Sequence, residues 1–239
     1  MATVPRMPVY ADVEDDVELL VPEEETVPED DLHGILVDLI RAGLVARFAD
    51  DADVAVFSRL AWFPDRQDTR IRLDPDVMVV RGRPPGHRKS YKAWMEDGVA
   101  PAVIVEVWSE DDTDGDYRRR LGRALRHGVA EVVIVDPFAV GGVRVEHLRS
   151  DGDRYRSVAS TSSADRLVIV ESLGISFAGG EELRVIEDGR RWPTTAEAFL
   201  LARSEAERAD RETLRADQET ARADRLAALL REAGVDLEA

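Results

Sequence analysis

The sequence predicts an α/β fold with a mixed central sheet, followed by a long C-terminal helix. Residues 101–137 form a short apolar run, a helical segment and a second apolar run, which is typical of two buried strands joined by a helix. Shorter strand patterns before and after this stretch predict antiparallel additions to the sheet. From Thr194 onward Ala, Glu, Arg and Leu dominate, with opposite charges four residues apart, which favours an exposed helix.

The composition excludes several classes of protein. The 239 residues contain no cysteine, so disulfides and thiolate metal sites are excluded. No apolar run is long enough for a membrane span, and the N-terminus lacks a basic region followed by an apolar one, which predicts a cytoplasmic protein. Phosphate-binding glycine loops, zinc-protease helices and serine-hydrolase elbows are also missing from the sequence.

Charge divides the chain into three predicted regions. Residues 1–31 hold eleven acids and one base, which leaves −7 of the net charge of −17 for the rest. This acidic segment is predicted to be a flexible arm. Residues 32–193 are predicted to form the α/β domain, and residues 194–239 an exposed helix that could pair as a coiled coil in a homodimer. The acidity argues against tight, sequence-independent DNA binding.

The elements of the domain follow from capping and periodicity. A helix begins near Asp31, and residues 53–63 alternate as a strand expected to form a hairpin with the next one. The helix between the two central strands spans residues 115–127, with Asp116 as a possible cap and Gly128 as its left-handed end. Asp136 is interpreted as a turn residue. Later segments, VRVEHLR, RYRSVAS and RLVIVESLGISF, are predicted to be antiparallel strands.

Two acids lie where the pattern predicts buried strands. Glu106 stands inside the apolar run 103–109, and Asp76 precedes the strand VMVV. A buried carboxylate is costly unless a cation or hydrogen-bond donors compensate it. Two such acids brought together would suit Mg²⁺ or Mn²⁺. The alternative for each acid is a turn residue or an ordinary ion pair.

The series PDVMVV, PAVIVEVWS, DYRRRLGRALRHGV and EVVIVDP resembles the Uma2 family, a branch of the PD-(D/E)XK nuclease superfamily. The order and spacing of these motifs carry the resemblance, which runs from about His33 to Trp192. It implies a restriction-endonuclease-like three-layer core and a Mg²⁺- or Mn²⁺-dependent endonuclease acting on nucleic acid, with DNA as the expected substrate. Asp76 matches the Asp of the PD motif, and Glu106 matches the acid of the (D/E)XK motif.

The chain departs from the superfamily pattern at one position. The Lys expected two residues after the acid is Trp108 here. Uma2-like sequences instead carry a Ser three residues after the acid, matched by Ser109, and a Lys in the next helix. That helical position holds Arg120, which could orient a phosphate but is a poor proton acceptor.

Further site residues are expected around this pair. The backbone carbonyl of Val107 would complete a metal site. The family pattern also places His33 at the metal, where a neutral imidazole could ligate the ion or bridge to it through water. His33 alone would be interpreted as a surface residue of the first helix. Arg88, Lys89 and Lys92 lie in the most basic stretch and are predicted to contact nucleic acid, with Tyr91 and Trp94 either stacking on bases or anchoring the loop.

Two functions therefore stay open. The first is a metal-dependent endonuclease in which Asp76 and Glu106 hold the cation and Arg120 steadies the phosphate. The second is a catalytically degenerate nuclease fold that binds a partner or oligomerises. Trp108 in place of the Lys and the acidic charge favour the second.

Overall fold

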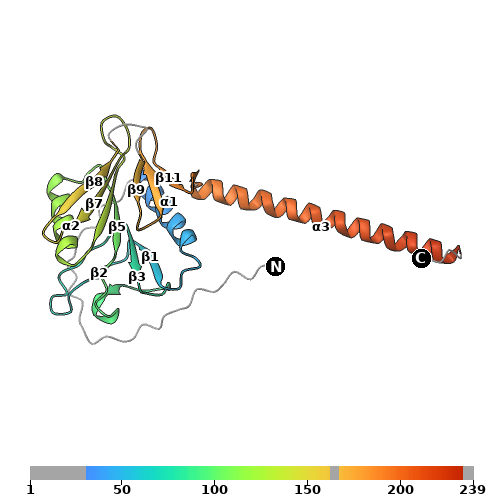
Figure 1. Ribbon diagram of the computed structural model, residues 1–239, viewed down its shortest axis with the longest axis horizontal. Helices are drawn as coiled ribbons and strands as arrows, with labels where there is room; N and C mark the ends of the chain where they lie inside the picture. The colour runs from blue at the N-terminus through green and yellow to red at the C-terminus, as the bar shows by residue number, and fades with distance from the viewer. Residues whose placement is uncertain (1–30, 162–166, 234–239) are drawn as a thin grey trace. The chain divides into compact units, whose positions relative to one another are not determined.

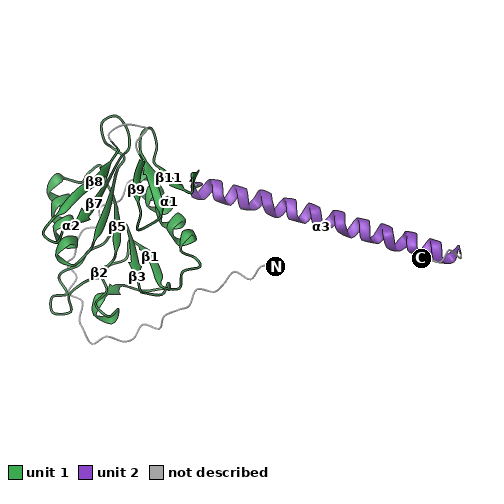
Figure 2. Cartoon of the chain, viewed as in Figure 1, with its two compact units in different colours: residues 1–192 green, residues 193–239 purple. Residues whose placement is uncertain are grey.

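The structure is a computed structural model that describes residues 31–161 and 167–233. The chain divides into two compact units, residues 1–192 and residues 193–239 (Figure 2). Of the predicted acidic arm, only Asp31 lies within the described residues.

A six-stranded mixed sheet forms the centre of the first unit. Its order is β1-β3-β5-β6-β7-β8, and only the β5–β6 pair is parallel among these neighbours. This arrangement confirms the predicted fold class. The strands are β1 (Val54–Ser58), β3 (Val77–Arg81), β5 (Val103–Val107), β6 (Glu131–Asp136), β7 (Arg144–Ser150) and β8 (Tyr155–Ser160).

Two helices cover opposite faces of this sheet (Figure 1). Val103, Val105 and Val107 of β5 pack in one core with α1 (Asp31–Arg47), whereas Ile104 packs in the other core with α2 (Asp114–Arg126). This alternation follows from the two-residue period of a strand. Glu106 therefore lies on the face that α2 covers.

Smaller sheets complete the two outer layers. Four antiparallel strands pack in the core on the α1 side, and a two-stranded parallel sheet packs on the α2 side. The larger one contains β9 (Leu167–Val170), β10 (Ile175–Ala178), β11 (Arg184–Glu187) and β12 (Arg190–Arg191); the smaller one contains β2 (Trp62–Phe63) and β4 (Tyr91–Lys92), which leads into the 3-10 helix η1 (Ala93–Met95).

The predicted strand over residues 53–63 is two strands, which corrects the sequence interpretation. β1 ends at Ser58, and Arg59 adopts a positive φ of 49°. The Arg59 N–H donates to the carbonyl of Asp76, at 3.2 Å. The turn sends the chain away from the central sheet, so β2 pairs with β4 instead.

The start of α2 also differs from the prediction. Thr113 is the N-cap residue, and its hydroxyl oxygen accepts a hydrogen bond from the Asp116 N–H at 3.2 Å. Asp116 accepts the Thr113 N–H in return, at 3.3 Å, which makes a reciprocal capping box. Gly128, with φ of 87°, follows the end of the helix as predicted.

The second unit consists of α3 (Thr195–Glu232), which begins at a capping box between Thr194 and Glu197. None of its residues is buried. Pairs four residues apart, such as Arg208 and Glu212 at 3.0 Å, support it along its length. Within the described ranges, every helix is too short or too polar to cross a membrane.

The packing of α1 on Trp192 yields a stability test. A methyl group added at Gly43 would overlap the Trp192 ring, so Gly43→Ala should destabilise the protein by about 1–3 kcal/mol despite the better helix propensity of Ala. Gly122→Ala in α2 is the matched control, because the new carbon would lie 3.5 Å from the mobile end of Arg126. It should be neutral or stabilising by up to about 1 kcal/mol. Urea denaturation of both variants measures the difference, and equal stabilities would contradict the packing.

Candidate active site

The register of the central sheet brings the two predicted acids together. Val77 of β3 is paired with Val105 of β5 in an antiparallel ladder. One step further along that register, Asp76 stands opposite Glu106. Both side chains are buried, with exposed fractions of 7% and 8% for the two residues. The pair therefore lies at the end of the β3–β5 ladder.

Asp76 is held by donors from two elements. Its Oδ2 accepts the backbone N–H of Val107 at 2.7 Å, and its Oδ1 lies 3.2 Å from Nε2 of His33 in the first turn of α1. His33 is itself buried. The structure thus brings His33 and Val107 to the acid pair. Each carboxylate oxygen can accept a further contact, since it carries two lone pairs.

Glu106 is compensated less completely than Asp76. Its Oε2 lies 3.5 Å from Nη1 of Arg120, at the outer limit of a hydrogen bond. Burial raises the pKa of the Glu106 carboxyl well above its ordinary value, the charge of Asp76 raises it further, and Arg120 opposes both. Burial and the charge of Asp76 thus make Glu106 hold its proton more firmly than a solvent-exposed glutamate does.

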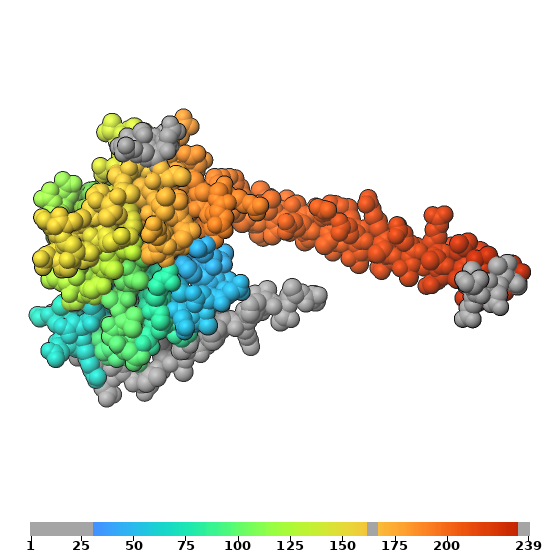
Figure 3. Space-filling view, viewed as in Figure 1, coloured from blue at the N-terminus to red at the C-terminus, as the bar shows by residue number. Residues whose placement is uncertain are grey.

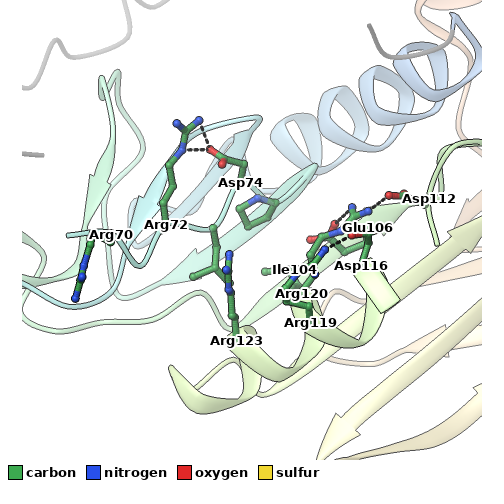
Figure 4. Close-up of a pocket in the computed structure, with 12 residues that line it drawn as sticks. Arg70, Arg72, Asp74, Ile104, Glu106, Asp112, Asp116, Arg119, Arg120 and Arg123 are labelled. Carbon is green, nitrogen blue, oxygen red and sulfur yellow. Dashed lines mark hydrogen bonds and ion pairs between the residues drawn. The ribbon is translucent and has the colours of Figure 1, made fainter. Parts of the chain in front are cut away.

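Arg120 bridges two acids. Besides Glu106 it makes an ion pair with Asp112 through Nη2 (Figure 4). Asp112 in turn accepts the backbone N–H of Ser109 at 3.1 Å, so it ties the end of β5 to the α2 side of the site. Asp112 was missed in the sequence because it is one of five acids in the turn EDDTDGD, and only the fold shows which one faces Arg120.

Trp108 follows Glu106 by two residues and stands where the sequence resemblance predicts a Lys. The indole packs against Tyr117 of α2, with ring centroids 5.0 Å apart. Burial, followed by the charges of Glu146 and Glu106, raises the pKa of Tyr117. Neither side chain replaces the missing cation, so Arg120 is the positive charge that reaches Glu106 in the described part of the chain.

A cavity of about 470 Å³ opens beside Glu106, between α2 and residues 70–75. Figure 4 shows Arg72 and Asp74 on one side, Glu106, Asp112 and Arg120 on the other, and Arg123 extending from α2 between them. Residues 70–75 form part of the surface in the cyan region of Figure 3. The lining includes five arginines and four acids: Arg70, Arg72, Arg119, Arg120 and Arg123 with Asp74, Glu106, Asp112 and Asp116.

The predicted nucleic-acid contacts lie elsewhere. Arg88, Lys89 and Lys92 do not line this cavity. The guanidinium of Arg88 pairs with Glu96, at 2.6 Å, and lies 4.9 Å from the centre of the Phe57 ring. Tyr91 is fully buried and its hydroxyl donates to the Val99 carbonyl. Stacking of Tyr91 on bases is therefore wrong, and the anchoring alternative is correct.

The donor set fits a hard cation. Among residues 31–161 and 167–233, no three His, Asp or Glu side chains group closely enough to hold a metal by themselves. Magnesium, however, is usually bound by one or two carboxylates and completed by water and substrate oxygens. Asp76 and Glu106 supply those carboxylates, and burial leaves Glu106 short of positive charge. Glu106 lines the cavity, whereas Asp76 does not.

A comparison with protein-family models agrees with the resemblance. A family model described as "Uma2: Putative restriction endonuclease" matches residues 7–183. No protein of curated function matches the sequence. A crystal structure of a putative nuclease belonging to DUF820 from Anabaena variabilis ATCC 29413 is similar at 15% identity and a TM-score of 0.45, over 64% of this chain and 80% of that one.

The raised pKa of Glu106 predicts how stability changes with pH. An unfolded Glu titrates near pH ~4.3, so between that pH and the raised folded value the folded chain binds more protons than the unfolded chain. In metal-free buffer the free energy of unfolding should therefore fall as pH rises, by up to about 1.4 kcal/mol per unit from this group. Glu106→Gln should remove that contribution.

Urea denaturation in EDTA at several pH values isolates the effect as the difference between wild type and variant. Glu110→Gln is the matched control, since Glu110 is exposed and the charge change is the same. Identical pH profiles for wild type and Glu106→Gln would contradict the burial argument.

Proposed function

The chain belongs to the Uma2 family, described as putative restriction endonucleases, and from that premise we propose that it is a divalent-metal-dependent endonuclease. The reaction is hydrolysis of phosphodiester bonds in nucleic acid, with DNA as the substrate and Mg²⁺ or Mn²⁺ as the cation. One observation carries the proposal: Asp76 and Glu106 are buried side by side, and the charge of one raises the pKa of the other. A cation between them would relieve that repulsion.

We propose three ligands from the protein. Asp76 and Glu106 contribute carboxylate oxygens, and Val107 contributes its backbone carbonyl. In an extended strand the N–H and C=O of one residue point to the same side. The Val107 N–H points to Asp76, so its carbonyl is oriented toward the same space. All three are oxygen donors, which suit Mg²⁺ and Mn²⁺.

His33 and Arg120 support this site in different ways. His33 orients Asp76 through the 3.2 Å contact between Nε2 and Oδ1, as a second layer of contacts typically does for metal ligands. Arg120 is 41% exposed and lines the cavity, so its guanidinium can reach a phosphate while staying near Glu106. It remains charged at any working pH and orients that phosphate without accepting a proton.

A bound divalent cation supplies two effects: it lowers the pKa of a water bound to it, and it neutralises charge on the phosphate. The protein contributes the geometry. Val107 and His33 fix Asp76, the strand fixes Glu106, and Asp112 fixes Arg120. These supports come from α1, from β5 and from the turn that precedes α2.

A second function is favoured by a specific observation. Arg120 already reaches Glu106 at 3.5 Å, and an arginine that compensates the acid could stand where a cation would bind. In that case the domain is a degenerate nuclease fold that binds a partner, with α3 available for self-association. Metal binding separates the two functions directly.

Cleavage assays test the enzyme. With Mg²⁺ or Mn²⁺, wild type should cut plasmid DNA, while Glu106→Gln and Asp76→Asn should each lose at least about 100-fold in rate, because each removes a charged metal ligand. Glu110→Gln should cut like wild type. Equal cleavage by wild type and Glu106→Gln would exclude Glu106 from the mechanism.

Isothermal titration with Mn²⁺ tests the site without catalysis. Wild type should bind, and its affinity should rise by up to about tenfold per pH unit while Glu106 loses its proton, because cation and proton compete for the same carboxylate. Asp76→Asn should bind more weakly at every pH. Absence of binding at millimolar Mn²⁺ would support the scaffold instead.

A further inference from the structure

We infer that Arg123 binds a backbone phosphate of the nucleic acid next to the phosphate at Glu106, so that the strand follows α2 and residues 70–75. This inference rests on the proposed function, because it takes nucleic acid to be the ligand of the cavity. The surface that contacts nucleic acid is then the cavity wall. The sequence had instead predicted the basic stretch around Arg88 as that surface.

The ion pairs of the cavity single out Arg123. Four of its five arginines each pair with a nearby acid: Arg70 with Asp68, Arg72 with Asp74, Arg119 with Asp116, and Arg120 with Asp112 and Glu106. Within the described ranges, the Arg123 side chain makes no hydrogen bond or ion pair. Its guanidinium is therefore the charge in the wall that is available for an external anion.

The balance of charge in the cavity agrees with an anionic ligand. Five arginines against four acids give the lining a net charge of +1, although the whole chain carries −17. Phosphate recognition by arginine is strong because the guanidinium donates in a planar, bidentate manner.

The helix sets the spacing between the two phosphate contacts. Arg123 follows Arg120 by three residues, so both project from one face of α2, about 4.5 Å apart along its axis. Side chains at this spacing have Cβ atoms about 5–6 Å apart, which allows two long guanidinium groups to reach successive phosphates of one strand. The floor beside them is apolar, formed by Leu73, Pro75 and Ile104, which suits the sugar of the intervening nucleotide.

The stretch 81–92 is less suited to this role. Arg88 is held by Glu96, and its side chain is only 7% exposed. Arg83 makes an ion pair with Asp97. These arginines are already engaged in holding their own loop together, so they would have to break ion pairs before binding phosphate.

Binding without cleavage tests the inference. A short fluorescent duplex DNA is titrated with the full chain carrying Glu106→Gln, in EDTA, at several salt concentrations, and anisotropy is recorded. Adding Arg123→Gln should weaken binding about 3- to 10-fold and reduce the slope of log K against log salt by about 0.9, the value for one lost phosphate contact.

Arg126→Gln in the same background is the matched control. Arg126 lies in the same last turn of α2, is exposed and is not part of the cavity. It removes the same charge from the same helix, so it should change affinity less than about twofold. Thermal melts of both variants confirm folding.

The outcomes separate this inference from the proposed catalysis. Loss of binding in Arg123→Gln alone supports the inference, even if the wild type cuts nothing. Equal losses in Arg123→Gln and Arg126→Gln would overturn it, because the effect would then be one of overall charge. No DNA binding by the Glu106→Gln parent would overturn it as well, whatever the metal titrations show.

Discussion

The repulsion between two buried carboxylates is the constraint on which the rest of the structure depends. Asp76 and Glu106 are both more than nine-tenths buried and face each other at the end of one ladder. Donors satisfy Asp76 well, but Glu106 has only Arg120 at 3.5 Å. Proteins retain such uncompensated acids mainly at functional sites, since burial of charge costs stability. The domain therefore fixes Asp76 with hydrogen-bond donors, whereas Glu106 can still bind a ligand.

The layers of the fold explain how this asymmetry is maintained. His33 reaches Asp76 from the first turn of α1 on one face of the sheet, and Arg120 reaches Glu106 from α2 on the other. The left-handed turn at Arg59 fixes the backbone of Asp76 through the N–H contact to its carbonyl. The two acids thus depend on different halves of the domain, which is why neither half forms the site alone.

The sequence predicted the parts that local pattern determines. Strand β5, helix α2 and the cap at Gly128 follow from periodicity and glycine chemistry, and Glu106 was identified because an acid interrupts an apolar run. Contacts set by tertiary packing could not be predicted. Asp112 is indistinguishable from its acidic neighbours without the fold, and Arg123 was one of five arginines spread around a helix. The break at Arg59 also lacked a signal, because the turn contains no glycine.

The acidic chain and the arginine-lined cavity are compatible because electrostatic range is short. At physiological salt the screening length is ~8 Å, so acids outside the cavity hardly weaken a phosphate contact inside it. The acids elsewhere on the chain do remove the long-range attraction between protein and nucleic acid. The chain therefore lacks the non-specific affinity that a basic protein has for any polyanion. Binding must then come from contacts made within the cavity, where Arg72, Arg119 and Arg120 are paired with acids and Arg123 remains available. Such an arrangement favours a ligand whose shape matches the cavity, and it disfavours a ligand that offers negative charge alone.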